Sequence, residues 1–361
     1  MFSSLVIGYL FLDGTGAGMM FLLCLLECFN ARRRFGDDST HSRLGRTFAG
    51  RTMPPAHSLS IRPKRKGTTL ATDASYVYVQ TETKRDVVFR WFALPSEFFS
   101  RAWPVCLGCL CISILCLFAD LGHPERIVNL LIHPSFSVMT VGAYALIAAF
   151  LLALAFTVLV LLEGFFPKAR TVVALSVLGC IVAMVVMTYT SVLLSSLASV
   201  LFWQTPLLPL VFVLSSLSCG IAAVFFVAVF VEARQPIIAS LNSLARADGV
   251  LIALEMLALA GYLLWALADT GTDKAARAFL YGDLSVLFWV ALVSIGLLLP
   301  LMLERFVTYS NYRSQLIWVA AAVLCGGLAL RACMVYAGAY DATQLFQGMQ
   351  YSAPISMLLG N

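Results

Sequence analysis

The stretch VMTVGAYALIAAFLLALAFTVLVLL (138–162) decides the fold of this chain, because it holds no charged residue. About 20 apolar residues suffice to cross the hydrocarbon core of a bilayer as α-helix. Backbone groups at that depth must be satisfied within the segment, which excludes isolated strands. The chain of 361 residues is 60% hydrophobic and only 12% charged, whereas a soluble domain carries about a quarter charged residues. The sequence therefore predicts an all-α polytopic membrane protein.

Similar apolar runs recur along the chain and predict eight transmembrane helices. The expected spans are 3–28, 99–120, 138–163, 170–198, 206–232, 248–269, 283–303 and 315–338. The first run is not expected to be a cleaved signal peptide. It is too long, no positive region precedes it, and Arg32, Arg33 and Arg34 follow it.

Positive charge is concentrated between the first two spans, where 14 of the 24 Lys and Arg residues lie, from Arg32 to Arg101. Basic residues near span ends mark cytoplasmic loops. We therefore expect both termini to be extracytoplasmic. The expected domains are helix 1 in 1–30, a basic and largely flexible cytoplasmic loop in 31–97, helices 2–4 in 98–200, helices 5–8 in 201–340 and an extracytoplasmic tail in 341–361.

Metal and haem sites are not expected. All ten cysteines fall inside apolar spans, and Cys106 and Cys109 form a C-x-x-C spacing without a second pair. A structural zinc or an iron–sulfur cluster needs four ligands. The four histidines lie in loops or at span ends, so no span offers an axial haem ligand at its centre. We predict no haem, no iron–sulfur cluster and no metal in this chain.

Ionisable residues at membrane depth are costly and mark functional sites by default. Asp13 lies in the middle of the first span, followed by GTGAG (14–18), a small-residue run that permits close helix approach. Glu255 follows Asp248 by seven residues, which places both on one helix face. Arg331 lies deep in the last span. These residues either serve proton movement or neutralise one another in the helix bundle.

The joint DLGHPERIVNLLIHPSFS (120–137) gathers scarce polar groups between two apolar runs. Asp120, His123, Arg126 and His133 lie there with two prolines. A metal or haem site is one interpretation, and the histidine positions argue against it. The other two are a corner in which the prolines turn the chain and the rim of a ligand pocket.

Five motifs in order resemble the NrfD/polysulfide reductase membrane-subunit family, the quinone-reactive anchors of complex iron–sulfur molybdoenzymes. The motifs are LFLDGTGAGMMFLL (10–23), DLGHPERIVNLLIHPSFSVMTVGAYAL (120–146), YTSVLLSSLASVLFWQTPLLPLVFVLSSLSCG (189–220), the Asp248–Glu255 pair and LRACMVYAG (330–338). They extend from the first helix to the last. The resemblance implies two four-helix bundles with a quinone pocket in helices 1–4.

The resemblance also assigns roles to single residues. Tyr189 matches a family tyrosine beside the quinone head group, and Arg331 matches an arginine implicated in proton movement. Tyr9 stands where some members carry a quinone-contacting histidine, and Asp13 stands where a small or apolar residue is common. The expected quinone-binding residues are Tyr9, Asp13, Asp120, His123, Arg126, His133 and Tyr189. The expected proton-transfer residues are Asp13, Asp248, Glu255 and Arg331.

The function implied is a multi-pass anchor in a bacterial or archaeal cytoplasmic membrane. It would oxidise a quinol, with menaquinone the expected type. Electrons would pass to a four-cluster ferredoxin-like subunit and then to a molybdopterin subunit that reduces the terminal substrate. The alternatives are a secondary transporter, in which Asp13, Glu255 and Arg331 bind a substrate or ion, and a purely structural anchor. A transporter often shows repeated halves with matching helix breaks, and no such repeat is visible in the sequence.

Overall fold

A computed structural model describes residues 4–49, 96–121, 137–162, 169–197, 200–231, 235–268, 272–304 and 312–352. Its elements, in order along the sequence, are α1 (Ser4–Ala49), α3 (Ser96–Leu121), α5 (Val138–Leu161), α6 (Ala169–Ser195), η1 (Leu201–Trp203), α7 (Leu207–Val229), α8 (Gln235–Ala268), α9 (Asp273–Tyr281), η2 (Leu287–Leu298), α10 (Leu299–Glu304) and α11 (Tyr312–Ser352). Within these ranges there is no strand. The predicted all-α class is confirmed.

Seven of the described helices are long and apolar enough to cross a membrane. They contain the stretches Leu5–Phe29, Glu97–Asp120, Val138–Leu161, Arg170–Ser195, Leu207–Val229, Ser240–Ala268 and Arg313–Gly338. The span predicted at 283–303 corresponds to η2 and α10, which form a shorter apolar segment, Leu287–Leu303. The polytopic character is confirmed, whereas the count of eight spans and the two four-helix bundles remain predictions.

Three helices differ in length from the predicted spans. The membrane-length part of α8 begins at Ser240, eight residues before the expected start at 248. Asp248, the expected first residue of the span, lies within the helix, where its buried carboxylate accepts a hydrogen bond from Ser218. In addition, α1 continues to Ala49 and α11 to Ser352, beyond the spans expected for them.

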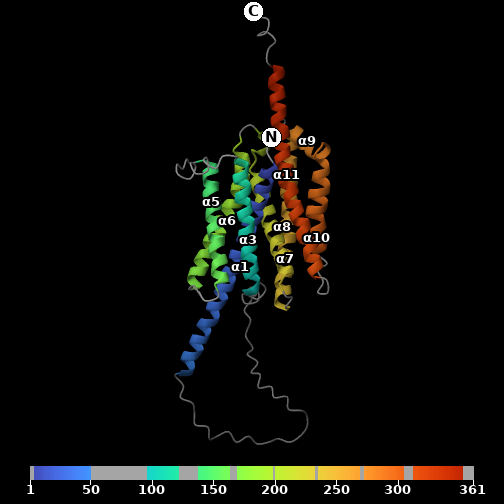
Figure 1. Ribbon diagram of the computed structural model, residues 1–361. Coiled ribbons are helices and arrows are strands. Elements are labelled where there is room, and N and C mark those ends of the chain that lie inside the picture. Colours follow the sequence, from blue (N-terminus) through green and yellow to red (C-terminus); the bar gives the residue numbers. More distant parts are fainter. Residues whose placement is uncertain are drawn as a thin grey trace, which may run out of the picture.

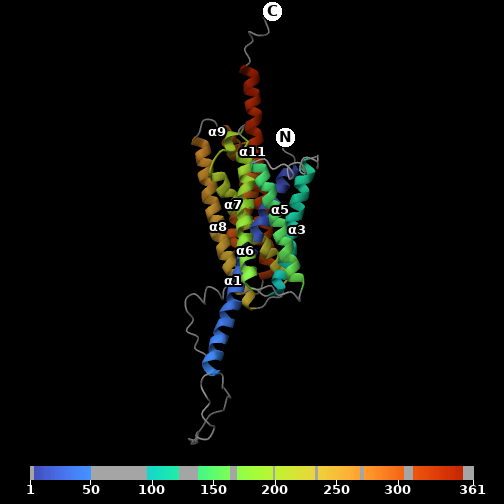
Figure 2. The same ribbon diagram turned by 90° about the vertical axis from the view of Figure 1, so that its left-hand side faces the viewer.

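The membrane-length helices stand side by side, and successive segments run alternately up and down when η2 and α10 are counted between α8 and α11 (Figure 1). Helix α1 contacts α3, α6 and α7, and α5 packs against α3 and α6. Helix α7 contacts α8 and α11, and α11 packs against η2 and α10. The start of α1 and the end of α11 lie on the same side of the assembly, while the far part of α1 projects from the opposite side (Figure 2).

The contact between α1 and α7 is a backbone-to-backbone approach made possible by glycine. A Cβ atom on Gly18 would lie 1.9 Å from the Ser216 carbonyl oxygen, and one on Gly220 would lie 2.3 Å from the Gly18 carbonyl carbon. The small-residue run in the first span was expected to permit such an approach, and this expectation is confirmed. The approach brings polar residues of α1 against those of α7.

Candidate functional site

A first cluster of polar side chains joins α1 to α6. Tyr9 and Asp13 are four residues apart and therefore share one face of α1. Both are buried, as is Tyr189 on α6. The Tyr9 and Tyr189 phenols lie close enough to interact with each other and with the charge of Asp13. Three residues that the sequence placed in one pocket are therefore brought together.

The carboxylate oxygens of this cluster lack hydrogen-bond partners within the described part of the protein. Neither carboxylate oxygen of Asp13 has a hydrogen-bond partner there, although both atoms are buried. A buried polar atom without a partner costs about 1–3 kcal/mol. The arrangement thus presents two carboxylate oxygens to a ligand or a proton.

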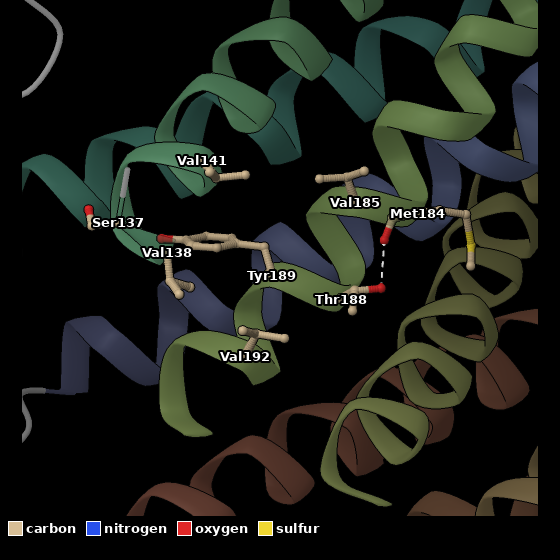
Figure 3. A pocket seen from close by; sticks show the side chains of 8 residues that line it. All are labelled: Ser137, Val138, Val141, Met184, Val185, Thr188, Tyr189 and Val192. Carbon is tan, nitrogen blue, oxygen red and sulfur yellow. Dashed lines mark hydrogen bonds between the residues drawn. The ribbon is translucent and has the colours of Figure 1, made fainter. Parts of the chain in front are cut away.

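A groove opens beside this cluster between α5 and α6 (Figure 3). Its volume is about 570 Å³, within the range of small-molecule sites. The lining residues are Ser137, Val138, Val141, Met184, Val185, Thr188, Tyr189 and Val192. Five of these eight are aliphatic or methionine, so the groove suits an apolar ligand that carries a few polar atoms.

Tyr189 connects the groove to the cluster. Its side chain extends from α6 toward the start of α5, near Val138 (Figure 3). Its ring lies against Gly142 of α5, where a Cβ atom would come within 1.8 Å of the ring. Only glycine leaves room for the ring at this position. The Tyr189 ring therefore lies between the groove and the Tyr9–Asp13 pair. The other polar residue of α6 in the groove, Thr188, donates a hydrogen bond to the Met184 carbonyl oxygen at 2.8 Å.

A second cluster surrounds Arg331 on α11. The buried guanidinium donates to the Ser215 hydroxyl at 2.5 Å, the Ser216 hydroxyl at 2.8 Å and the Gly327 carbonyl at 3.3 Å. It also donates to the Phe212 carbonyl at 3.4 Å and lies 5.2 Å from the centre of the Phe212 ring. Hydrogen bonds to a charged donor are stronger than neutral ones. The charge is therefore held mainly by serine hydroxyls and backbone carbonyls of α7 and α11.

Two carboxylates of α8 extend the second cluster. Glu255 interacts with the Arg331 charge and is hydrogen-bonded to Ser215, so Ser215 bridges the two ionisable groups. Asp248 accepts a hydrogen bond from Ser218 at 2.7 Å and interacts electrostatically with Glu255. The predicted set Asp248, Glu255 and Arg331 is therefore one contiguous network.

A small cavity lies inside this network. It has a volume of about 10 Å³, which is room for about one water molecule. Ser215, Ser218, Cys219 and Glu255 line one part, and Gly296, Leu297, Val323, Gly326 and Gly327 line the rest. The glycines of η2 and α11 meet there, because a Cβ atom on Gly296 would lie 2.3 Å from the Gly326 Cα.

The two clusters meet at Gly14, the residue after Asp13. A Cβ atom there would lie 2.7 Å from the Ser216 hydroxyl oxygen and 3.0 Å from an Arg331 guanidinium nitrogen. The backbone beside Asp13 therefore contacts the Arg331 network directly. The Asp13 carboxylate itself makes no hydrogen bond to Arg331, which argues against simple mutual neutralisation of these two residues.

The remaining predicted site residues lie apart from both clusters or outside the described ranges. Asp120 is an exposed residue near the end of α3. His123, Arg126 and His133 lie outside the described residues. Reasoning from the sequence did not identify Ser215, Ser216 and Ser218, although their run SSLS interrupts an apolar span. It also missed the groove residues of α5, which look like ordinary span residues.

The fold and the two clusters define a multi-pass integral membrane protein with ionisable residues buried among its helices. Residues 87–341 match the family model described as "Polysulphide reductase, NrfD". The protein therefore belongs to the NrfD/polysulfide reductase family, as the motifs predicted.

Three curated relatives show the extent of the similarity. Protein NrfD of Escherichia coli is 29% identical over 253 residues, which cover 64% of this protein and 79% of the relative. The matching subunit of the polysulfide reductase of Wolinella succinogenes is 29% identical over 243 residues, 62% of this protein and 77% of the relative. A NrfD homolog of Haemophilus influenzae is 31% identical over 193 residues, 49% of this protein and 60% of the relative.

Proposed function

We propose that this protein is the quinone-reactive membrane anchor of a respiratory oxidoreductase complex. The observation that carries the proposal is the apolar groove whose wall contains Tyr189, backed by Tyr9 and the unpartnered Asp13 carboxylate. A quinone has an apolar tail and two ring oxygens, so it needs an apolar groove with hydrogen-bonding groups at one end. Family membership favours this function over a secondary transporter.

The chemistry follows from the charge balance of quinol oxidation. The quinol loses two protons and two electrons, and its ring oxygens need hydrogen-bond partners while they do so. Tyr189 lies in the groove and Asp13 lies behind it. We assign Tyr189 to orientation of a ring oxygen and Asp13 to acceptance of a proton, since a positioned carboxylate is an effective general base. Arg331, Glu255 and Asp248 would carry protons onward.

The partners are part of the same proposal. The Wolinella succinogenes relative is named as one of the polypeptides of polysulfide reductase, so it belongs to a larger enzyme. We propose that electrons pass to a four-cluster ferredoxin-like subunit and from it to a molybdopterin subunit. The protein described here would then be the quinone-reactive subunit and not the one that reduces the terminal substrate. Menaquinone is the proposed quinone.

A substitution that fills the groove tests whether the quinone binds there. Val141 lines the groove and is half exposed, so Val141→Trp should place an indole where the ligand ring would lie. We expect binding of a hydroxyquinoline N-oxide, a quinol analogue whose fluorescence is quenched on binding, to weaken by about tenfold or more, or about 1.4 kcal/mol. The measurement is a fluorescence titration of the purified complex.

The matched control is Val177→Trp, because Val177 lies on α6, is similarly exposed and does not line the groove. Its affinity for the analogue should equal that of the unmodified protein. Equal affinities for all three proteins would place the quinone site elsewhere and remove the observation that carries the proposal.

We also propose that the start of α1 and the end of α11 face away from the cytosol. These ends lie on one side of the assembly (Figure 1), and basic residues concentrate after the first span, as expected of a cytoplasmic loop. In intact cells, a membrane-impermeant maleimide should label a cysteine introduced at Thr343 and leave one at Ser39 unlabelled until the cells are lysed. The reverse pattern would invert the orientation.

A further inference from the structure

A short helical segment, η1, closes one end of the helices that carry the Arg331 network. Phe202 and Trp203 of η1 are fully buried. The Trp203 indole N–H donates to the Met334 carbonyl at 2.9 Å. Its ring occupies the space over Gly338, where a Cβ atom would lie 1.9 Å from the ring. Trp203 is therefore fixed on α11 one to two turns beyond Arg331.

Aromatic residues of two other helices complete this closure. The Tyr262 hydroxyl of α8 donates to the Phe202 carbonyl at 2.5 Å, and the two rings meet edge to face at 5.2 Å. Phe279 of α9 lies 6.1 Å from the Phe202 ring and is also fully buried. We call Phe202, Trp203, Tyr262 and Phe279 the aromatic cap. The cap connects η1, α8, α9 and α11 at the membrane face where α11 leaves the assembly (Figure 2).

The layer between the aromatic cap and the Arg331 network is apolar. Among the described residues, the buried side chains at this level include Leu208, Val211, Phe212, Leu259 and Met334. A buried water needs two to four polar partners, and these side chains offer none. Water does not enter such a layer readily, so α7, α8 and α11 offer protons no hydrogen-bonded route through it.

Polar groups continue in the other direction. From Arg331 they pass through Ser215 to Glu255 and, past the cavity, to Ser218 and Asp248. Asp248 precedes Glu255 by seven residues, which is about 10 Å along the helix axis toward the start of α8. Ser240, another buried polar residue, precedes Asp248 by eight residues at the start of the membrane-length part of α8.

We propose that the aromatic cap is a proton seal, so that Glu255 and Asp248 exchange protons with water only at the membrane face where α8 begins. The inference rests on the proposed role of these acids in proton movement. In this proposal, Trp203 prevents protons from reaching the network from the opposite membrane face. Protons from the groove would enter the network at Arg331 and leave it toward the start of α8.

The test is the passive proton permeability of proteoliposomes that contain the purified protein, an internal pH-sensitive dye and no quinol. An imposed potassium diffusion potential drives the protons. Trp203→Ala should raise the flux by about tenfold, because it leaves a cavity beside the Met334 carbonyl, which loses its indole partner and becomes a polar group that water can bind. Adding Glu255→Gln to this variant should return the flux to the unmodified level. Trp318→Ala, which removes a largely exposed indole of α11, should not change it.

Assembly of each variant is checked by gel filtration before reconstitution. Trp203→Leu keeps an apolar side chain over Gly338, and it replaces the alanine variant if that variant does not assemble; its expected flux is intermediate. The proposal of a seal is wrong if an assembled Trp203 variant shows an unchanged proton flux. It is also wrong if the raised flux persists after Glu255→Gln is added. Because the assay contains no quinol, either outcome is independent of the groove experiment.

Discussion

Asp13→Asn is expected to slow quinol-dependent turnover by roughly a hundredfold or more, because a positioned general base contributes about 10²–10⁴ to rate. The substitution keeps the size of the side chain and most of its hydrogen-bonding capacity but removes the group that takes the proton. Both oxygens of the carboxylate are buried without partners among the described residues, so no hydrogen bond of the fold is lost. The complex should assemble and bind the quinol analogue as before.

The measurement compares two electron donors. Turnover with a quinol should fall, whereas turnover with an artificial donor that reduces the iron–sulfur subunit directly should survive. Thr15→Val is the control on the same helix, because the buried Thr15 hydroxyl donates only to the Phe11 carbonyl, at 2.8 Å. If Asp13→Asn instead abolished both activities and the partners were lost, Asp13 would be a structural residue and the assignment as base would fail.

The sequence was sufficient to predict the membrane helices because their apolar runs are long and nearly free of charge. It also placed Asp248 with Glu255, since a spacing of seven residues puts side chains on one helix face, whereas Tyr9 and Asp13 were assigned to one pocket by the family resemblance. The glycines after Asp13 predicted a close approach, and Gly18 makes one. These are local properties, which the order of residues determines directly.

The neighbours of each helix could not be predicted in the same way. In a membrane, both the lipid-facing and the buried side of a helix are apolar, so periodicity does not mark the buried face. Helices α5 and α7 are similarly apolar, yet 72% of the α7 span is buried against 28% of the α5 span. For this reason the serines of α7 were not connected to Arg331, and the groove between α5 and α6 was not foreseen.

The start of α8 has a related explanation. The membrane span was expected to begin at Asp248. In the structure one carboxylate oxygen of Asp248 accepts a hydrogen bond from Ser218 of the neighbouring helix, and the helix continues on both sides of it. A tertiary hydrogen bond thus replaces the solvent that a boundary residue would need, and only the fold supplies that partner.

Gly18→Val is expected to prevent assembly of the helices. A Cβ atom at this position would lie 1.9 Å from the Ser216 carbonyl oxygen and 2.8 Å from its carbon, and these atoms belong to the backbone of α7. Overpacking typically costs about 1–3 kcal/mol when side chains can move aside, and here α1 and α7 must separate as whole helices. We expect little folded protein by gel filtration of the solubilised membranes, and an intermediate yield for Gly18→Ala.

Gly8→Val is the matched control, because Gly8 lies on the same helix and a Cβ atom there meets nothing within 4 Å. It carries the same cost of a β-branched residue in a helix, so any difference between the two variants reports the contact with α7. Equal yields and equal melting temperatures would show that α1 and α7 are not in backbone contact. Since Ser216 also binds Arg331 at 2.8 Å, separation of these helices would detach the Asp13 cluster from the Arg331 network, and protons taken up at the groove would have no route inward.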